Sequence, residues 1–396
     1  MIRRIGIKKR ILAVLAALAL TSGLTACFDR RELDTLGIVI GVAIDKGETE
    51  GETELTLQIA NVAESQSSKQ GSNTSKKEES GGSSFFNVSH SGKTVNTILR
   101  DLEHMISRRV YIPHIQVIIF GEELAREGVR DSLDFFARAP EARMTLYVFV
   151  AKGKAADILN VKSLLEAYPS TALMQRIKNQ DITSDTPIVT EFEFVRTMMN
   201  KSTAAVLPIV EITEQKDRQR LLVGGCAVFK DSRMVGELDK KETRGLLWVK
   251  GEVEAGILSV ELMGVCAAAE IVSAKSRVNA ELREDGTIFF RITVDEVQAL
   301  GDQTGITNLA APENLPALLE ESERVIADEI QSALDQSWEL QADIFGFGEY
   351  ISRKYPDKWK DMEDNWDELY QKIEVEIEVN AKADGTGRTI MPLIPE

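Results

Sequence analysis

The sequence predicts a fold of the α+β class that is divided into more than one domain. Segments with apolar residues at three- and four-residue spacing, which is typical of amphipathic helices, alternate along the chain with short strand-like apolar runs. Because neither kind dominates, we expect sheets with packed helices. The chain has 396 residues, more than a single hydrophobic core usually holds, so its length predicts two or three domains.

Residues 1–26 predict a lipoprotein signal peptide that is removed from the mature chain. Five basic residues precede the apolar run Ile11 to Leu20, which is the order found in signal peptides. This run is too short for a stable transmembrane helix, which needs about 20 residues. The segment Leu24 to Cys27 resembles the bacterial lipobox, so we expect cleavage between Ala26 and Cys27 and a diacylglyceryl group on the Cys27 thiol. Two acyl chains, such as palmitate, form a durable anchor. An uncleaved N-terminal helix is the alternative.

The charge of the mature chain argues against nucleic acid as a partner. Without residues 1–26, 42 basic and 63 acidic residues remain, which gives a net charge of −21. Nucleic-acid binding usually depends on basic patches that neutralise phosphates. We therefore interpret the acidic excess as a solvated surface.

The cysteines and histidines predict neither a disulfide framework nor a metal site. Besides Cys27, the chain contains Cys226 and Cys266, both in apolar, strand-like surroundings. We expect two buried free thiols, with a single bridge between them as the alternative. His90, His104 and His114 lack the spacing of metal ligands.

Residues 27–155 form the first predicted domain, an α/β unit with a flexible loop. Its predicted strands cover residues 37–44, 54–62, 85–88, 111–120 and 144–150, and its predicted helices cover residues 94–108 and 122–138. The polar, low-complexity segment near residues 63–84 cannot bury enough surface to offset its ordering entropy. We expect a hairpin loop there, as a flexible linker or, alternatively, a docking arm.

The remainder divides into a helical middle region, residues 156–220, which contributes to a second domain, and a C-terminal α/β region, residues 221–396. The middle region contains helical patterns at residues 163–180 and 190–199. The C-terminal region returns to strands, and Asp285-Gly286 predicts a hairpin turn because glycine accepts a positive φ. A long helix is expected near residues 316–342, followed by a closing strand at 373–379.

No catalytic site or cofactor site is predicted. The carboxylate pairs lie in charged helices, where a solvated surface is the more common explanation. Gly346-Phe-Gly348 and Gly385-Thr-Gly387 lack the lysine and the strand–loop–helix setting of phosphate-binding loops. No nucleophile elbow is present. The sequence therefore favours a protein that is not an enzyme.

Several longer motifs occur in a fixed order along the mature chain. They are CFDRRELD from Cys27, GVAID at 41–45, HIQVIIFGEELAR at 114–126, AVFK at 227–230, ETRGLLW at 242–248 and DIFGFG at 343–348. In this order they resemble the Ger(x)C family of spore-germination lipoproteins. One departure is Phe28, where the family usually has tryptophan, and this is a mild aromatic exchange.

The resemblance implies three mixed α/β domains, each a sheet with packed helices, behind the cleaved signal peptide. It also implies the C subunit of a nutrient germinant receptor, needed for spore germination in response to nutrients. Such a subunit works with the A and B membrane subunits and is lipid-anchored to the extracytoplasmic face of the spore inner membrane through Cys27. Whether this subunit binds a nutrient is left open. The alternatives are a solute-binding lipoprotein of a transporter, which needs two similar lobes, and an envelope hydrolase, whose nucleophile and metal motifs are missing.

Overall fold

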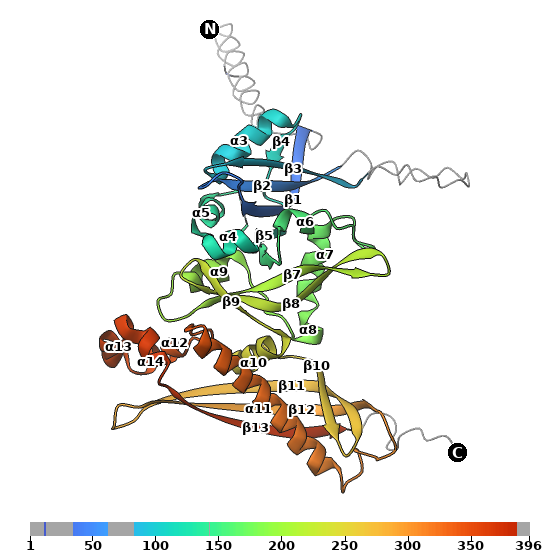
Figure 1. Ribbon diagram of the computed structural model, residues 1–396, viewed down its shortest axis with the longest axis vertical. Coiled ribbons are helices and arrows are strands. Elements are labelled where there is room, and N and C mark those ends of the chain that lie inside the picture. Colours follow the sequence, from blue (N-terminus) through green and yellow to red (C-terminus); the bar gives the residue numbers. More distant parts are fainter. Residues whose placement is uncertain (1–11, 13–34, 62–82, 142, 386–396) are drawn as a thin grey trace, which may run out of the picture.

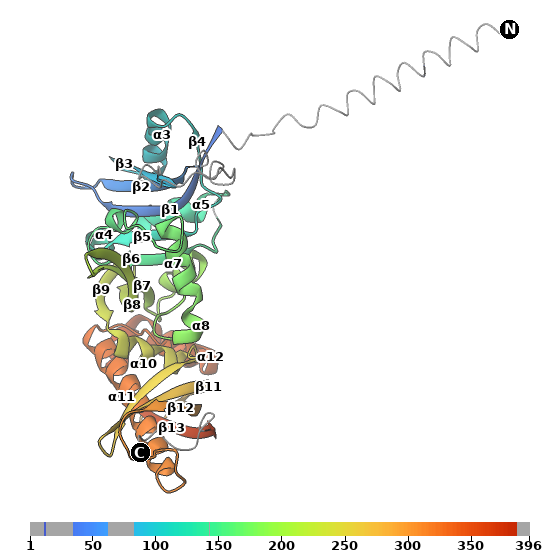
Figure 2. The same cartoon turned by 90° about the vertical axis from the view of Figure 1, so that its right-hand side faces the viewer.

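The structure is a computed structural model that describes residue 12 and residues 35–61, 83–141 and 143–385. The described chain forms an elongated column, with a nine-stranded sheet in its upper half and a four-stranded sheet in its lower half (Figures 1 and 2). Apart from residue 12, the predicted signal peptide lies outside the described residues, as do Cys27 and most of the predicted loop near residues 63–84.

The upper sheet has the strand order β3-β2-β1-β5-β6-β7-β8-β9, and β4 pairs with β1. Its strands are β1 (Leu36–Lys46), β2 (Thr53–Ala60), β3 (Phe85–Gly92), β4 (Arg109–Tyr111), β5 (Val117–Gly121), β6 (Tyr147–Ala151), β7 (Ala205–Gln215), β8 (Arg218–Lys230) and β9 (Arg233–Leu238). Strands β1, β5, β6 and β7 are parallel, and antiparallel hairpins extend the sheet on both sides.

This sheet continues across both boundaries that the sequence suggests for the middle region. Residue 155 lies between two strands of the same sheet, and residue 220 lies inside β8. The described residues therefore hold two sheets, and the division into three domains at those positions stays a prediction. Strands β6 and β7 pair with each other in this sheet, although more than fifty residues of chain separate them.

The upper sheet is covered by helices on both faces. Helices α3 (Val95–Met105), α4 (Glu122–Glu127), α5 (Arg130–Arg138) and α9 (Glu191–Met198) pack on one face, and α6 (Ala155–Ile158) and α7 (Pro169–Lys178) pack on the other. The short helix α8 (Gln180–Thr183) follows α7 and contacts β10 (Gly256–Leu262) of the lower sheet. Along β5, Ile118 and Phe120 point into the first core and Val117 and Ile119 into the second. Burial on both faces explains why β5 reads as a continuous apolar run.

Three predicted elements need correction. The helix expected over residues 122–138 is interrupted at Gly128, whose φ is +135° and which separates α4 from α5. The helix expected from residue 163 begins only at Pro169, because proline suits the first helical position and disfavours helix in the residue before it. The strand expected over residues 111–120 is divided between β4 and β5.

The lower half consists of a four-stranded sheet with helices packed on it. The strands are β10 (Gly256–Leu262), β11 (Val265–Leu282), β12 (Ile288–Gln303) and β13 (Glu374–Gly385), in that order. The helices are α10 (Lys240–Lys250), α11 (Leu315–Glu339), α12 (Phe347–Lys354), α13 (Pro356–Met362), the short 3-10 helix η3 (Glu363–Asn365) and α14 (Trp366–Tyr370). The predicted long helix, closing strand and Asp285-Gly286 turn are all present, and Gly286 has a φ of +89°.

One hydrophobic core joins the two halves. It combines Val206, Cys226 and Leu238 of the upper sheet with residues of α10, α11 and the lower sheet. Helix α10 lies between the halves in both views (Figures 1 and 2). Because the apolar contacts are continuous, we expect the two halves to resist independent movement.

The two cysteines in the described part of the chain are free thiols with different surroundings. Cys226 is fully buried, as expected, and burial raises the pKa of its thiol to about 12. Cys266 is exposed, so the prediction of a second buried thiol is wrong. Its side chain alternates along β11 with the inward-pointing Val265 and Ala267, which places it on the solvent side.

Candidate functional site

The motif at residues 343–348 is a helix cap built around a buried carboxylate. Asp343 accepts hydrogen bonds from the backbone N–H groups of Phe347 (3.0 Å) and Gly348 (2.8 Å), and from Nε1 of Trp366 (3.1 Å). Burial raises the pKa of Asp343 to about 6, although these hydrogen bonds oppose the shift. A Cβ on Gly348 would lie 2.5 Å from Cβ of Ser202. The two glycines of this motif therefore serve a turn and close packing.

The motifs at residues 41–45 and 114–126 meet at the end of β1. The carboxylate of Asp45 accepts hydrogen bonds from the backbone N–H groups of Ala155 (2.7 Å) and Ala156 (2.9 Å), at the start of α6. A Cβ on Gly121 would lie 2.1 Å from Oδ1 of Asp45. Burial raises the pKa of Asp45, and the two backbone hydrogen bonds act against this. Asp45 thus fixes the loop after β6 to the parallel strands.

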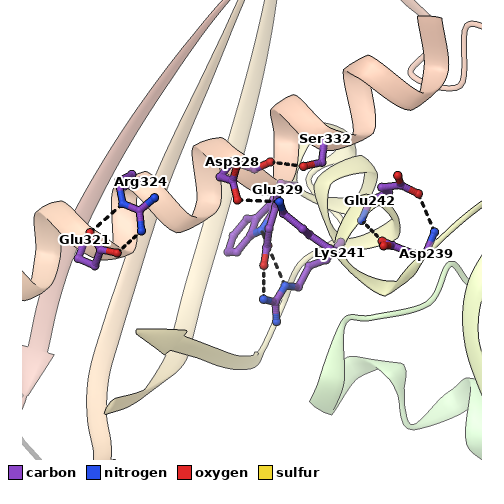
Figure 3. A network of polar contacts seen from close by, with 10 residues as sticks. Asp239, Lys241, Glu242, Glu321, Arg324, Asp328, Glu329 and Ser332 are labelled. Atoms are coloured by element: carbon purple, nitrogen blue, oxygen red, sulfur yellow. Dashed lines mark hydrogen bonds and ion pairs between the residues drawn. The ribbon is translucent and has the colours of Figure 1, made fainter. Parts of the chain in front are cut away.

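The motif at residues 242–248 attaches α10 to α11 (Figure 3). Arg244 reaches both carboxylate oxygens of Glu329, with its Nε 2.8 Å from Oε2, and Nε1 of Trp248 also donates to Oε2 at 2.8 Å. The Glu329 side chain is only 5% exposed. A Cβ on Gly245 would lie 2.0 Å from the carbonyl oxygen of Glu329, so glycine permits the close helix contact.

The same motif also begins α10. Asp239 and Glu242 form a capping box, in which the backbone N–H of each residue donates to the carboxylate of the other, at 2.7 and 2.8 Å (Figure 3). Lys241 adds an ion pair with Asp328 of α11 (2.7 Å). These contacts are structural, and they place no nucleophile beside a base.

A cavity of about 510 Å³ opens beside α7, on the sheet face that carries α6 and α7. It is lined by residues 161–166 of the loop before α7, by one side of α7 and by Arg220 and Leu221 of β8. Its charged lining residues are Lys162, Glu166, Arg176 and Arg220, and none of them forms an ion pair within the described residues. Sequence reasoning missed this cavity because its walls come from segments about sixty residues apart.

The described residues contain no group of three or more histidine, cysteine, aspartate or glutamate side chains that could hold a metal ion. Within the same residues, no helix is long and apolar enough to cross a membrane.

Comparison with known sequences identifies the family. The family model described as "Spore germination protein N-terminal domain" matches residues 29–212. The family model described as "Spore germination B3/ GerAC like, C-terminal" matches residues 224–387. The chain belongs to the Ger(x)C family of spore-germination proteins. The segment between the two matches, residues 213–223, covers the end of β7, the turn after it and the start of β8.

Relatives of this Ger(x)C-family chain match it over nearly their whole length. The spore germination protein YndF of Bacillus subtilis (strain 168) is 26% identical, with 94% of this chain and 96% of that protein covered. Spore germination protein B3 of the same organism is 25% identical, over 91% and 93% of the two chains. The crystal structure of the GerBC protein has a TM-score of 0.54 at 20% identity and covers 87% of this chain and 97% of that one, which supports a multi-domain α/β fold.

Proposed function

We propose that this Ger(x)C-family protein is the C subunit of a nutrient germinant receptor and that spores need it to germinate in response to nutrients. The observation that carries the proposal is the match to the N-terminal and C-terminal domains of the family in the right order, behind a segment at residues 24–27 that resembles a lipobox. The motif residues in the described part of the chain act as caps and helix contacts that hold the fold together. The two halves carry sheets of nine and four strands, unlike the two similar lobes of a solute-binding lipoprotein.

The subunit acts, in this proposal, by docking on the A and B membrane subunits at the extracytoplasmic face of the spore inner membrane. Confinement to one surface raises the effective concentration of partners, so weak contacts suffice for assembly. The test is co-purification from detergent-solubilised spore inner membrane with a C-terminally tagged chain, followed by mass spectrometry. Recovery of A- and B-type subunits with a diacylated Cys27 peptide supports the proposal, and a transporter permease in their place contradicts it.

Replacement of Cys27 by alanine should release the chain from the membrane and abolish most of the nutrient response. Without the thiol, no diacylglyceryl group can be attached, and the remaining contacts must hold the chain alone. The chain is measured in membrane and soluble fractions, and germination is followed by the loss of spore optical density. Cys266→Ala is the matched control, since it removes an exposed thiol far from the N-terminus. Normal germination of Cys27→Ala spores at wild-type receptor levels would refute the anchoring role.

The anchor also predicts which end of the column faces the membrane. Nine peptide units separate Cys27 from Leu36, the first residue of β1, and they span at most about 32 Å. Strand β4, which follows α3, pairs with the first residues of β1. The upper end with α3 is therefore close to the membrane, and the four-stranded sheet lies at the far end of the column (Figure 2).

A fluorophore on α3 should be quenched by lipids that carry a spin-labelled headgroup, whereas one on β11 should not. The first label is placed on Met105→Cys in a Cys266→Ser background, because Met105 is 59% exposed. The second label is placed on the native Cys266, and the buried Cys226 stays unlabelled in both proteins. The lipidated chain is reconstituted in vesicles for the measurement. Equal quenching at the two positions would rule out the upright orientation.

A further inference from the structure

We propose that the cavity beside α7 binds a small organic carboxylate with an apolar body. This site is assigned from the lining residues alone and does not rest on the receptor role. The lining combines three cationic side chains, Lys162, Arg176 and Arg220, with a single acidic one, Glu166. This excess of positive charge stands out in a chain whose net charge is −16. The cavity therefore favours an anion.

Among the arginines in the described part of the chain, only Arg220 has a buried side-chain nitrogen without a hydrogen-bond partner. Arg244, Arg283 and Arg291 each meet a carboxylate, whereas Arg176 and Arg220 meet none there. Nε of Arg220 is buried and has no hydrogen-bond acceptor in the described structure. A buried donor without an acceptor destabilises the structure, and a charged donor does so more strongly. A ligand that supplies the acceptor removes this cost.

The planar guanidinium group of Arg220 favours a carboxylate as the charged group of the ligand. Its planar N–H groups match the two oxygens of a carboxylate in a bidentate contact. Arg220 is held on β8, which is paired with β7 from Glu211 to Gln215, so its backbone position is fixed before a ligand arrives. Gln175 of α7 and Asn179, which follows the last residue of α7, line the same cavity. They add neutral hydrogen-bonding groups beside the cationic ones.

The apolar residues of the lining indicate that the rest of the ligand is apolar. Val161, Ala172 and Leu221 form part of the wall. The loop before α7 adds Leu164 and Leu165, whose exposed fractions are 62% and 94%. An apolar body between these leucines and the wall removes all of these surfaces from water. The volume of about 510 Å³ lies in the range of small-molecule sites.

Isothermal titration of the full chain in detergent with hexanoate tests the proposal, with the titration into detergent buffer as the reference. We expect saturable binding of hexanoate. Hexanamide, which has the same shape without the charge, should bind at least about tenfold more weakly, because a hydrogen bond to a charged group contributes about 1.5–3 kcal/mol. Acetate, which lacks the apolar chain, should also be weaker by at least about tenfold.

Variants assign the binding to this cavity. Arg220→Met should weaken hexanoate binding at least about tenfold, and Arg220→Lys, which keeps the charge but loses the planar fork, should give an intermediate loss. Arg100→Met is the matched control, since Arg100 is an exposed arginine on α3. Far-UV circular dichroism verifies that each variant is folded. Absence of saturable hexanoate binding, equal binding of hexanamide, or wild-type affinity in Arg220→Met and Arg220→Lys would each overturn the proposal. None of these results would affect the co-purification test of the receptor role.

Discussion

Replacement of Arg244 by alanine is expected to lower the free energy of unfolding by about 3–5 kcal/mol, the usual cost of breaking a buried ion pair from one side. Arg244 contacts both carboxylate oxygens of Glu329, and its Nη1 donates to the carbonyl oxygen of Ile257 at 2.9 Å. Without the guanidinium, Trp248 would be the one side chain among the described residues that still donates to this carboxylate, which is 5% exposed. Urea denaturation of the full chain, followed by tryptophan fluorescence, measures the change.

Arg324→Ala, on the helix that carries Glu329, is the matched control. Arg324 also forms an ion pair with a carboxylate, that of Glu321, but its side chain is 67% exposed (Figure 3). Solvent screening limits such a pair to less than about 1 kcal/mol. If Arg244→Ala loses no more stability than Arg324→Ala, water reaches Glu329 and the buried-pair explanation fails. A double variant, Arg244→Met with Glu329→Met, should recover most of the loss because it removes both charges.

Local sequence patterns predicted the elements whose packing depends on their own periodicity. In α3, Val95, Ile98 and Leu102 are buried as their spacing requires. Met105 follows the same spacing but is 59% exposed, because it is the last residue of the helix. The expected long helix is α11, whose apolar residues belong to the core that includes the lower sheet. These elements follow from rules that act within a few residues.

The upper sheet could not be predicted from such patterns, because its connectivity depends on contacts between distant segments. The apolar runs of β6 and β7 are both visible in the sequence, yet nothing local states that they pair in parallel across α6 to α9. The same limit applies to the cavity, since Arg220 meets the loop at residues 161–166 only through the position of β8. Cys266 shows a related limit, because an apolar neighbourhood does not tell which side of a strand faces solvent.

The family motifs were visible in the sequence, but their physical roles were not. Asp45 and Asp343 occur in apolar motifs as lone acidic residues, which could equally have served binding. In the structure both carboxylates accept backbone N–H groups at the start of a helix. The partner of the 242–248 motif, Glu329, lies more than eighty residues away in a helix rich in acids. Because α11 contains many acidic residues, its sequence does not show which glutamate is buried and which ones are exposed.

Replacement of Glu296 is expected to have a second large effect on stability, whose size depends on pH. This β12 residue is fully buried, and neither of its carboxylate oxygens has a hydrogen-bond partner within the described residues. Burial raises its pKa from 4.5 to about 8. Below pH 4.5, the folded and unfolded chains both keep the proton. Between pH 4.5 and about 8, the unfolded chain releases it and the folded chain does not, so the stability contributed by this group falls as pH rises and levels off above about pH 8.

Glu296→Gln should therefore be more stable than the wild type by roughly 2–4 kcal/mol at pH 8, and the difference should vanish near pH 4, where both chains are uncharged at this position. Urea denaturation at several pH values measures it, and groups such as Glu191 and Asp343 titrate in both proteins and cancel from the difference. Glu270→Gln, at an exposed position on β11, is the control and should show no such pH-dependent gain. A Glu296→Gln difference that does not change with pH would mean that Glu296 reaches solvent and is ionised in the folded chain.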